Sequence, residues 1–129
     1  MGIADEFKKL NAKQKNVQWS VSAFNSKNEL VLSLWEHYFS KIENGLIYKD
    51  KVSRWSGLGN QEFRQNFEMA YKNNSPIRVI ISKSSNPKGI ENGESGSQSK
   101  NTFHAKTDWI GKILLWDGDN FSIEFRREK

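Results

Sequence analysis

The sequence predicts a single α+β domain over residues 1–129, in which a curved mixed β-sheet or small open barrel carries two to three helices on its outside. Three observations predict this class. The run Ile77–Ser82 is short, β-branched and bounded by turn residues, as in a central strand buried on both faces. Apolar residues at helical spacing follow Asn60 and indicate an amphipathic helix. Asp117–Asn120 separates two β-type segments, which is a strong hairpin signal.

Composition limits the classes of function. The chain has 129 residues and no cysteine, so disulfides and thiolate metal sites are excluded and the cytoplasm is the expected location. No apolar run approaches the about 20 residues needed to cross a bilayer, so no membrane partner is expected. The net charge is +5, and the excess is concentrated between Lys72 and Lys106, where six basic residues stand against two acidic ones. Such a field attracts polyanions, above all nucleic acid, although a merely solvated surface is the competing interpretation.

Two elements are predicted before residue 25. Ile3, Phe7 and Leu10 fall at helical spacing, which predicts an amphipathic helix over about Gly2–Lys13. Strict alternation of apolar and polar residues then predicts a strand over Val17–Phe24.

A longer helix is expected next. Ser26–Glu29 has the form of a capping box, in which the serine and glutamate side chains satisfy orphan backbone donors. The apolar pattern of Leu30–Ile42 continues this helix, and Asn44-Gly45 ends it. Trp35 and Tyr38 would then point into the core.

A second helix and the central strand are predicted in the middle of the chain. Leu46–Tyr48 is expected to be extended, and Asn60 to be the N-cap of the helix. Asn73–Pro76 stops the helix before the central strand begins. The residues expected to point inward from the helix are Phe63, Phe67, Ala70 and Tyr71.

The carboxyl-terminal part is predicted to be a long loop followed by a hairpin. Residues 83–108 are rich in Ser, Asn, Gly and Lys, which predicts a basic, flexible loop, either for binding or as a tolerated insertion. The hairpin pairs Trp109–Trp116 with Phe121–Arg126. The lysines of the loop expected to hold phosphates are Lys83, Lys88, Lys100 and Lys106.

Catalysis finds little support in the sequence. The histidines, His37 and His104, lack neighbours at the spacing of a metal site or triad. Asp117 and Asp119 are explained by the hairpin turn. The glycines before the second helix lack the lysine of a P-loop. No catalytic residue, metal or cofactor is therefore expected within this chain.

The most informative residue is Trp55, which stands on a turn of small residues directly before a helix. A tryptophan in this position is badly placed for the core and well placed to stack on a flat ligand. Arg54 and the lysines of the loop would hold a nucleic-acid backbone. The polar residues expected to meet the edge of a base are Ser56, Asn60, Ser82 and Asn25.

These elements resemble YTH and EVE domains of the PUA-like group over about a third of the chain. The likeness lies in Trp55-Ser56, Gly59-Asn60, Ala70-Tyr71 and Pro76–Ser82. It implies a β-barrel module that binds a modified or flipped base. It also implies that Trp55 forms one wall of an aromatic cage and that Trp109 or Trp116 forms a second.

The expected function is therefore non-catalytic recognition of nucleic acid, with modified DNA favoured over RNA and the base flipped into an aromatic pocket. The resemblance implies a recognition module at the amino end of a modification-dependent restriction enzyme, whose nuclease or motor domain would lie outside this chain. The alternative is a small protein-interaction factor of the antirestriction or immunity type, with tryptophans as interface anchors.

Overall fold

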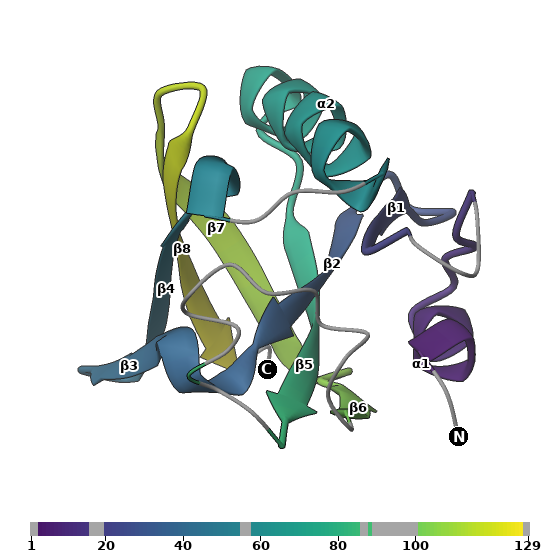
Figure 1. The fold of residues 1–129 in the computed structure, drawn as a ribbon, viewed down its shortest axis with the longest axis horizontal. Helices are drawn as coiled ribbons and strands as arrows, with labels where there is room; N and C mark the ends of the chain where they lie inside the picture. Colours follow the sequence, from purple (N-terminus) through teal and green to yellow (C-terminus); the bar gives the residue numbers. More distant parts are fainter. Residues whose placement is uncertain (1–2, 16–19, 55–57, 86–87, 89–100, 128–129) are drawn as a thin grey trace.

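A mixed β-sheet with helices against both faces forms the α+β fold of this chain (Figure 1). The computed structural model describes residues 3–15, 20–54, 58–85, 88 and 101–127. Within them the helices are α1 (Ile3–Lys9) and α2 (Leu58–Asn73), with 3-10 turns η1 (Glu36–Tyr38) and η2 (Val52–Arg54). The strands are β1 (Ser22–Phe24), β2 (Leu30–Trp35), β3 (Phe39–Ile42), β4 (Gly45–Lys51), β5 (Ile77–Ser84), β6 (Asn101–Ala105), β7 (Trp109–Trp116) and β8 (Asn120–Arg127).

The predicted mixed sheet is confirmed. Its strands follow the order β1-β2-β5-β7-β8-β4-β3, and β6 pairs with β5 off this path. β2 and β5 run parallel, whereas the other pairs are antiparallel. Because the path ends at β1 and at β3, the described part of the sheet is open.

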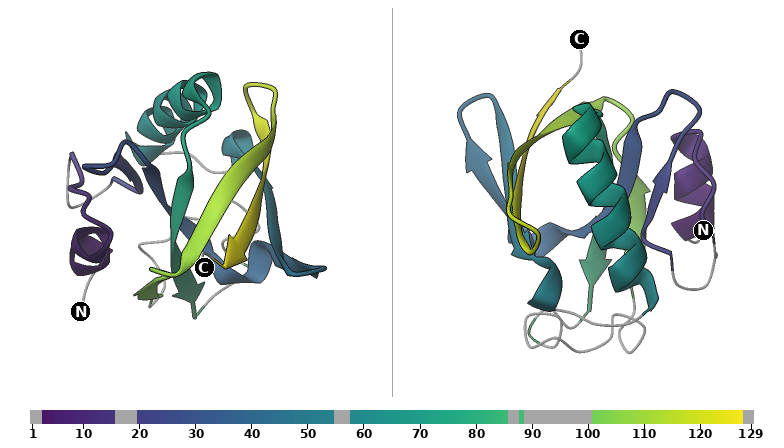
Figure 2. Two further views of the ribbon diagram at one scale, coloured as in Figure 1. Left: turned by 180° about the vertical axis from the view of Figure 1, so that it is seen from behind. Right: turned by 90° about the horizontal axis from the view of Figure 1, so that it is seen from above.

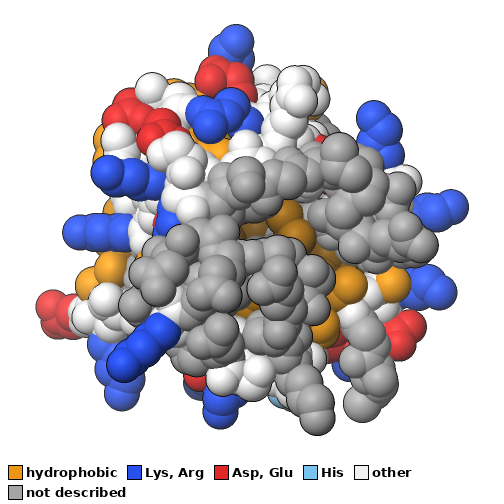
Figure 3. Space-filling model, viewed as in Figure 1, with side chains coloured by type: hydrophobic (Ala, Val, Ile, Leu, Met, Phe, Trp, Pro, Cys, Tyr) orange, Lys and Arg blue, Asp and Glu red, His pale blue; other side chains and the backbone are white. Residues whose placement is uncertain are grey.

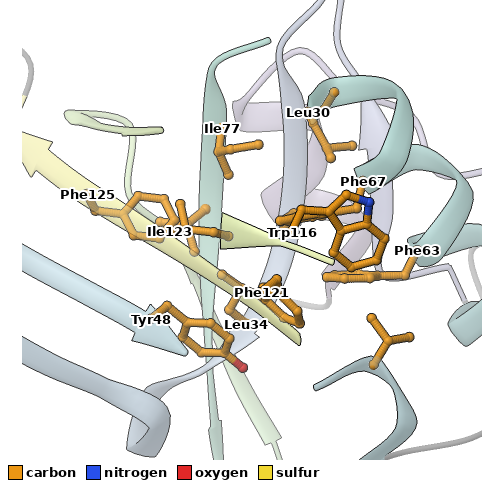
Figure 4. Close-up of a cluster of buried hydrophobic side chains, with 14 of the residues drawn as sticks. Leu30, Leu34, Tyr48, Phe63, Phe67, Ile77, Trp116, Phe121, Ile123 and Phe125 are labelled. Atoms are coloured by element: carbon orange, nitrogen blue, oxygen red, sulfur yellow. The ribbon is translucent and has the colours of Figure 1, made fainter. Parts of the chain in front are cut away.

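The main core lies between α2 and one face of the sheet. Phe67 is fully buried, and its ring lies 4.8 Å from that of Trp116 and 5.0 Å from that of Phe121, centroid to centroid (Figure 4). The predictions of α2, of the hairpin β7–β8 and of β5 as a buried central strand are confirmed, since Ile77–Ser82 is buried throughout. The local sequence of these elements favours the secondary structure that they adopt, and the burial of their apolar residues is consistent with it.

A smaller core lies on the opposite face, beneath α1. Phe7 and Leu10 pack there against Val31 and Ile80. The two views in Figure 2 show α1 beside β1, while α2 lies between β1 and the β7–β8 hairpin. α1 ends at Lys9, so it is shorter than the helix predicted over Gly2–Lys13.

The predicted helix over Leu30–Ile42 is wrong, because these residues form β2, η1 and β3. The apolar run that opens this segment fits a helix or a doubly buried strand equally well, and pairing with β1 and β5 decides for the strand. Leu30, Leu32 and Leu34 face the main core, whereas Val31 faces the smaller one.

The capping box is also wrong, because residues 26–29 form the turn between β1 and β2. The side-chain oxygen of Asn25 accepts hydrogen bonds from the backbone N–H groups of Lys27 and Glu29 at 3.0 and 2.9 Å. Asn28 has a φ of 62°, a left-handed conformation that asparagine tolerates. A side chain that bonds its own backbone in this way favours a turn over a helix start.

Three smaller expectations change as well. α2 begins at Leu58, so Asn60 lies inside the helix rather than at its N-cap, and its side-chain amide donates to the Val52 carbonyl. Tyr71 is 45% exposed instead of inward. Within the predicted loop over residues 83–108, residues 83–84 and 101–105 are strand, because β6 pairs with the end of β5. In the predicted strand Val17–Phe24, residues 17–19 lie outside the described part of the chain, and β1 covers only Ser22–Phe24.

Candidate functional site

Five partly buried aromatic side chains form two groups of neighbouring rings, and we call the five together the aromatic row. They are Trp35, His37, Tyr38, Phe39 and Trp109. Ring centroids are 6.4 Å apart between Trp35 and His37, 4.5 Å between His37 and Tyr38, and 6.3 Å between Phe39 and Trp109. Partly exposed rings at these spacings offer apolar faces to a flat ligand.

A cation lies over a ring of the row at two places. The Arg54 guanidinium carbon is 4.7 Å from the centroid of Tyr38, and the Lys106 ammonium is 5.4 Å from that of Trp109. Both distances are within the range of cation–π attraction. The predicted residues Arg54, Lys106 and Trp109 are thus brought to one set of aromatic rings.

Tyr48 links the two groups of rings, because its own ring lies near Tyr38 and near Phe39. Its buried ring lies 6.1 Å from Tyr38 and 4.9 Å from Phe39, and its hydroxyl donates to the Asp50 carboxylate at 3.3 Å. Burial, reinforced by the charge of Asp50, raises the pKa of Tyr48 well above its usual value. The hydroxyl therefore stays protonated and keeps its role as a donor.

Asp50 also holds Arg54 in place. Its two carboxylate oxygens each accept a hydrogen bond from the guanidinium at 2.7 Å, a bidentate arrangement that fixes orientation. Burial lowers the pKa of Arg54, but the hydrogen bond and charge of Asp50 outweigh it and raise the pKa overall. The guanidinium is therefore already engaged by Asp50 and Tyr38, and its contact with a nucleic-acid backbone stays a prediction.

The turn η2, directly before Trp55, is anchored to the hairpin tip. The Asp119 carboxylate accepts hydrogen bonds from the Ser53 backbone N–H at 2.7 Å and from the Ser53 hydroxyl at 2.8 Å. On the other side, Asn60 donates to the Val52 carbonyl at 2.7 Å. Trp55 and Ser56 themselves lie outside the described residues, so their predicted contacts with a base stay predictions.

The anchor at Asp119 predicts a pH dependence of stability. The hydrogen bond from the Ser53 hydroxyl, followed by that from its backbone N–H, lowers the pKa of Asp119. A pKa below that of the unfolded chain, about 3.9, stabilises the fold above this pH, and the contribution disappears as pH falls through the native pKa. Asp119→Asn should therefore be less stable than the wild type at about pH 6, with the gap narrowing below about pH 4. Urea unfolding midpoints across this range test it, and a gap that stays constant with pH would contradict it.

A shallow cavity of about 320 Å³ opens beside Trp109. This volume is at the lower end of the range for small-molecule sites, about 300–1,000 Å³. Arg126 donates to the Glu43 and Asn44 carbonyls at its rim, and Arg127 pairs with Asp108 at 3.3 Å. The cavity is lined by Asn44, Gly45, Leu46, Trp109, Phe125, Arg126 and Arg127.

Three other predicted site residues have side chains engaged elsewhere, although Ser82 is the register partner of Trp35 in the β2–β5 pair. Trp116 is only 8% exposed and donates its indole N–H to Glu68 at 2.8 Å, so it is a core residue with no free face for a ligand. Ser82 is buried and shares a hydrogen bond with Ser33. The Asn25 amide donates to the Leu10 carbonyl and to Glu29. Their side chains serve the interior and a turn, which leaves Trp109 as the candidate for the second wall.

The predicted phosphate-binding lysines are spread over several segments. Lys83 lies at the end of β5 with its side chain exposed, and Lys88 is exposed as well. Lys106 is partly buried against Trp109. Lys100 lies outside the described residues.

Four members of the row were missed as site residues by sequence reasoning, which placed Trp35 and Tyr38 in a helix core. The local pattern gave no signal against a helix. On a helix, which turns about 100° per residue, Trp35, Tyr38 and Phe39 would share one face, and only His37 would point elsewhere.

Comparison with known proteins identifies no relative. No family model, curated protein or solved structure matches the chain. Within the described residues, His, Asp and Glu side chains form no group of three or more placed to hold a metal ion. The described helices include none that is long and apolar enough to span a membrane.

Proposed function

We propose that this chain is a non-catalytic nucleic-acid-binding domain that recognises a modified DNA base, flipped from the duplex and stacked on the aromatic row. The observation that carries the proposal is the row itself, with Arg54 over Tyr38 and Lys106 over Trp109. Stacking a base on an aromatic ring contributes about 1–3 kcal/mol. This is of the same order as the few kcal/mol needed to take a base out of the stack.

The charge of the surface supports the same proposal. Figure 3 shows Lys and Arg side chains around the margin of one face, with some Asp and Glu side chains among them and hydrophobic side chains toward its middle. Exposed lysines such as Lys83 and Lys88 suit contacts with phosphates, which position a strand without reading its sequence. Hydrophobic side chains flanked by cations are an arrangement that suits a flipped base with flanking phosphates.

The remaining parts of the proposal come from the sequence. Trp55 would add a second stacking face next to Arg54, and the barrel-like, PUA-related architecture would be the scaffold. In the cytoplasm, such a module would direct a nuclease or motor domain outside this chain to modified DNA, as in a restriction system.

A binding screen tests the proposal. The protein should bind duplex DNA with an affinity that falls steeply with added salt, because phosphate contacts release counterions. Affinity should rise when one base of the duplex is modified, and RNA of the same sequence should bind more weakly. Fluorescence anisotropy with plain and modified oligonucleotides, duplex and single-stranded, measures each effect. Absence of binding to all of these probes at low salt would overturn the proposal.

The second candidate, a protein-interaction factor, is favoured by one observation on the outer surface. Leu114 and Leu115 are both 49% exposed, because the register of β7 shifts between Ile113 and Leu115 and turns neighbouring residues outward. Adjacent exposed leucines suit an apolar contact. Binding of a protein partner at these leucines should not depend on salt and should be lost in Leu114→Ser, whereas DNA binding by this variant should not change.

A further inference from the structure

Arg78, a buried arginine on β5, connects two parts of the fold that are far apart in the sequence. Its side chain is about 10% exposed. One guanidinium nitrogen, Nη1, donates to the Trp109 backbone carbonyl at 2.9 Å. The other two, Nε and Nη2, contact Oε2 of Glu29 at 3.1 Å each.

Glu29 is itself held by the turn between β1 and β2. Its second carboxylate oxygen accepts a hydrogen bond from the Asn25 amide at 2.8 Å, and its backbone N–H donates to the Asn25 side-chain oxygen at 2.9 Å. Asn25 also donates to the Leu10 carbonyl. Asn25 therefore fixes the orientation of the Glu29 carboxylate independently of Arg78.

Trp109 is paired with Arg127 of β8, but on its other side it lies beyond the end of the ladder between β5 and β7. Among the described residues, β7 pairs with β5 at a single position, Ile77 with Gly111, because β6 takes the place of β7 farther along β5. The turn before Trp109 adds two backbone bonds, from the Lys106 N–H to the Val79 carbonyl and from the Trp109 N–H to the Lys106 carbonyl. The Arg78 side chain thus supplies a bond from β5 to the start of β7, beyond the end of the ladder between these two strands.

We propose that Arg78, oriented by Glu29 and Asn25, is a positioning residue that sets the place of Trp109 in the aromatic row. Its effect on ligand binding rests on the proposed function of the row, whereas its effect on Trp109 does not. Arg78 acts through the Trp109 main chain and touches no ligand. An arginine suits this role because its planar fork bonds a carboxylate with one edge and a carbonyl with another nitrogen.

Arg78→Lys tests the proposal, because lysine keeps the charge but has a single nitrogen, which cannot contact Glu29 as two guanidinium nitrogens do and reach the Trp109 carbonyl as well. The readout is the indole N–H resonance of Trp109 in a ¹H–¹⁵N spectrum of the protein without ligand, assigned with Trp109→Phe. We expect this resonance to move while that of Trp116 stays in place. Arg64→Lys, which changes an arginine that bonds the Gly118 carbonyl at the hairpin tip, is the matched control and should leave Trp109 unaffected. A Trp109 resonance unchanged in Arg78→Lys overturns the proposal.

Glu29→Gln provides a second variant if Arg78→Lys does not fold. It keeps Arg78 and an acceptor oxygen, so we expect a smaller movement of the Trp109 resonance in the same direction, and no movement would likewise overturn the proposal. In binding assays Arg78→Lys should weaken the preference for modified DNA by about three- to tenfold, less than loss of the ring itself. Binding to plain DNA should remain within about twofold, because phosphate contacts are unchanged. If the wild type binds no oligonucleotide, the proposed function fails, while the spectrum still decides the role of Arg78.

Discussion

Phe67→Ala is expected to lower the free energy of unfolding by about 3–5 kcal/mol, the usual cost of deleting a buried phenyl ring. Phe67 is fully buried at the centre of the main core, where α2 meets the hairpin. Its ring contacts Phe63, Trp116 and Phe121, which come from both elements. The cavity left behind cannot collapse easily, because the surrounding rings are held by strands. Urea or thermal unfolding followed by circular dichroism measures the change, with an expected fall in Tm of about 10–20 °C.

Tyr71→Ala is the matched control, one helical turn farther along the same face of α2. The tyrosine is 45% exposed, so its loss should change stability by less than about 0.5 kcal/mol. Equal destabilisation by the two variants would show that the core does not lie where the structure places it. The comparison also tests the inward orientation that helical spacing alone predicts for Tyr71.

Trp109→Ala is expected to weaken binding of a modified-base duplex by about 5- to 150-fold, the equivalent of the 1–3 kcal/mol that a stacked base contributes. Trp109 is the member of the row that lines the cavity, and Lys106 lies over its ring. Trp109→Phe keeps a smaller aromatic face and should recover part of the affinity. Anisotropy titrations with modified and plain duplexes measure the loss, which should be greater for the modified duplex.

Two controls separate this effect from unfolding and from a protein-binding surface. Trp109 packs near Phe39 and Phe125, so the alanine variant will also be less stable and must be titrated well below its Tm. Leu114→Ser changes an exposed residue of the same strand and should leave DNA affinity as in the wild type. If Trp109→Ala binds modified DNA as tightly as the wild type does, the aromatic row is not the base-binding surface.

Local sequence patterns were sufficient to predict the elements whose ends are marked by turn residues. Asn73–Pro76 separates α2 from β5, and Asp117–Asn120 forms the hairpin turn, where the Asp117 carboxylate accepts the backbone N–H groups of Asp119 and Asn120. Side-chain chemistry within a few residues determines such boundaries. They were therefore predictable without any knowledge of what packs against them.

The candidate site was predictable only in part. Trp109 and Lys106 were singled out from the sequence, and the structure joins them through a cation–π contact. Trp116, in the same strand, is buried because its side chain faces α2, and no local pattern distinguishes the two tryptophans. The partners that complete the row come from a segment whose sequence reads as a helix.

The sequence by itself determined the α+β class, the second helix, the central strand, the final hairpin and the basic character of the middle of the chain. Each depends on periodicity, turn chemistry or charge, which act over a few residues. Only the tertiary structure decided that Leu30–Trp35 is a strand, because parallel pairing with β5 and burial on both faces outweigh a helical pattern. Pairing of β3 with β4, of β4 with β8 and of β8 with β7 brings Phe39 beside Trp109, a contact between residues distant in the chain that no local preference encodes.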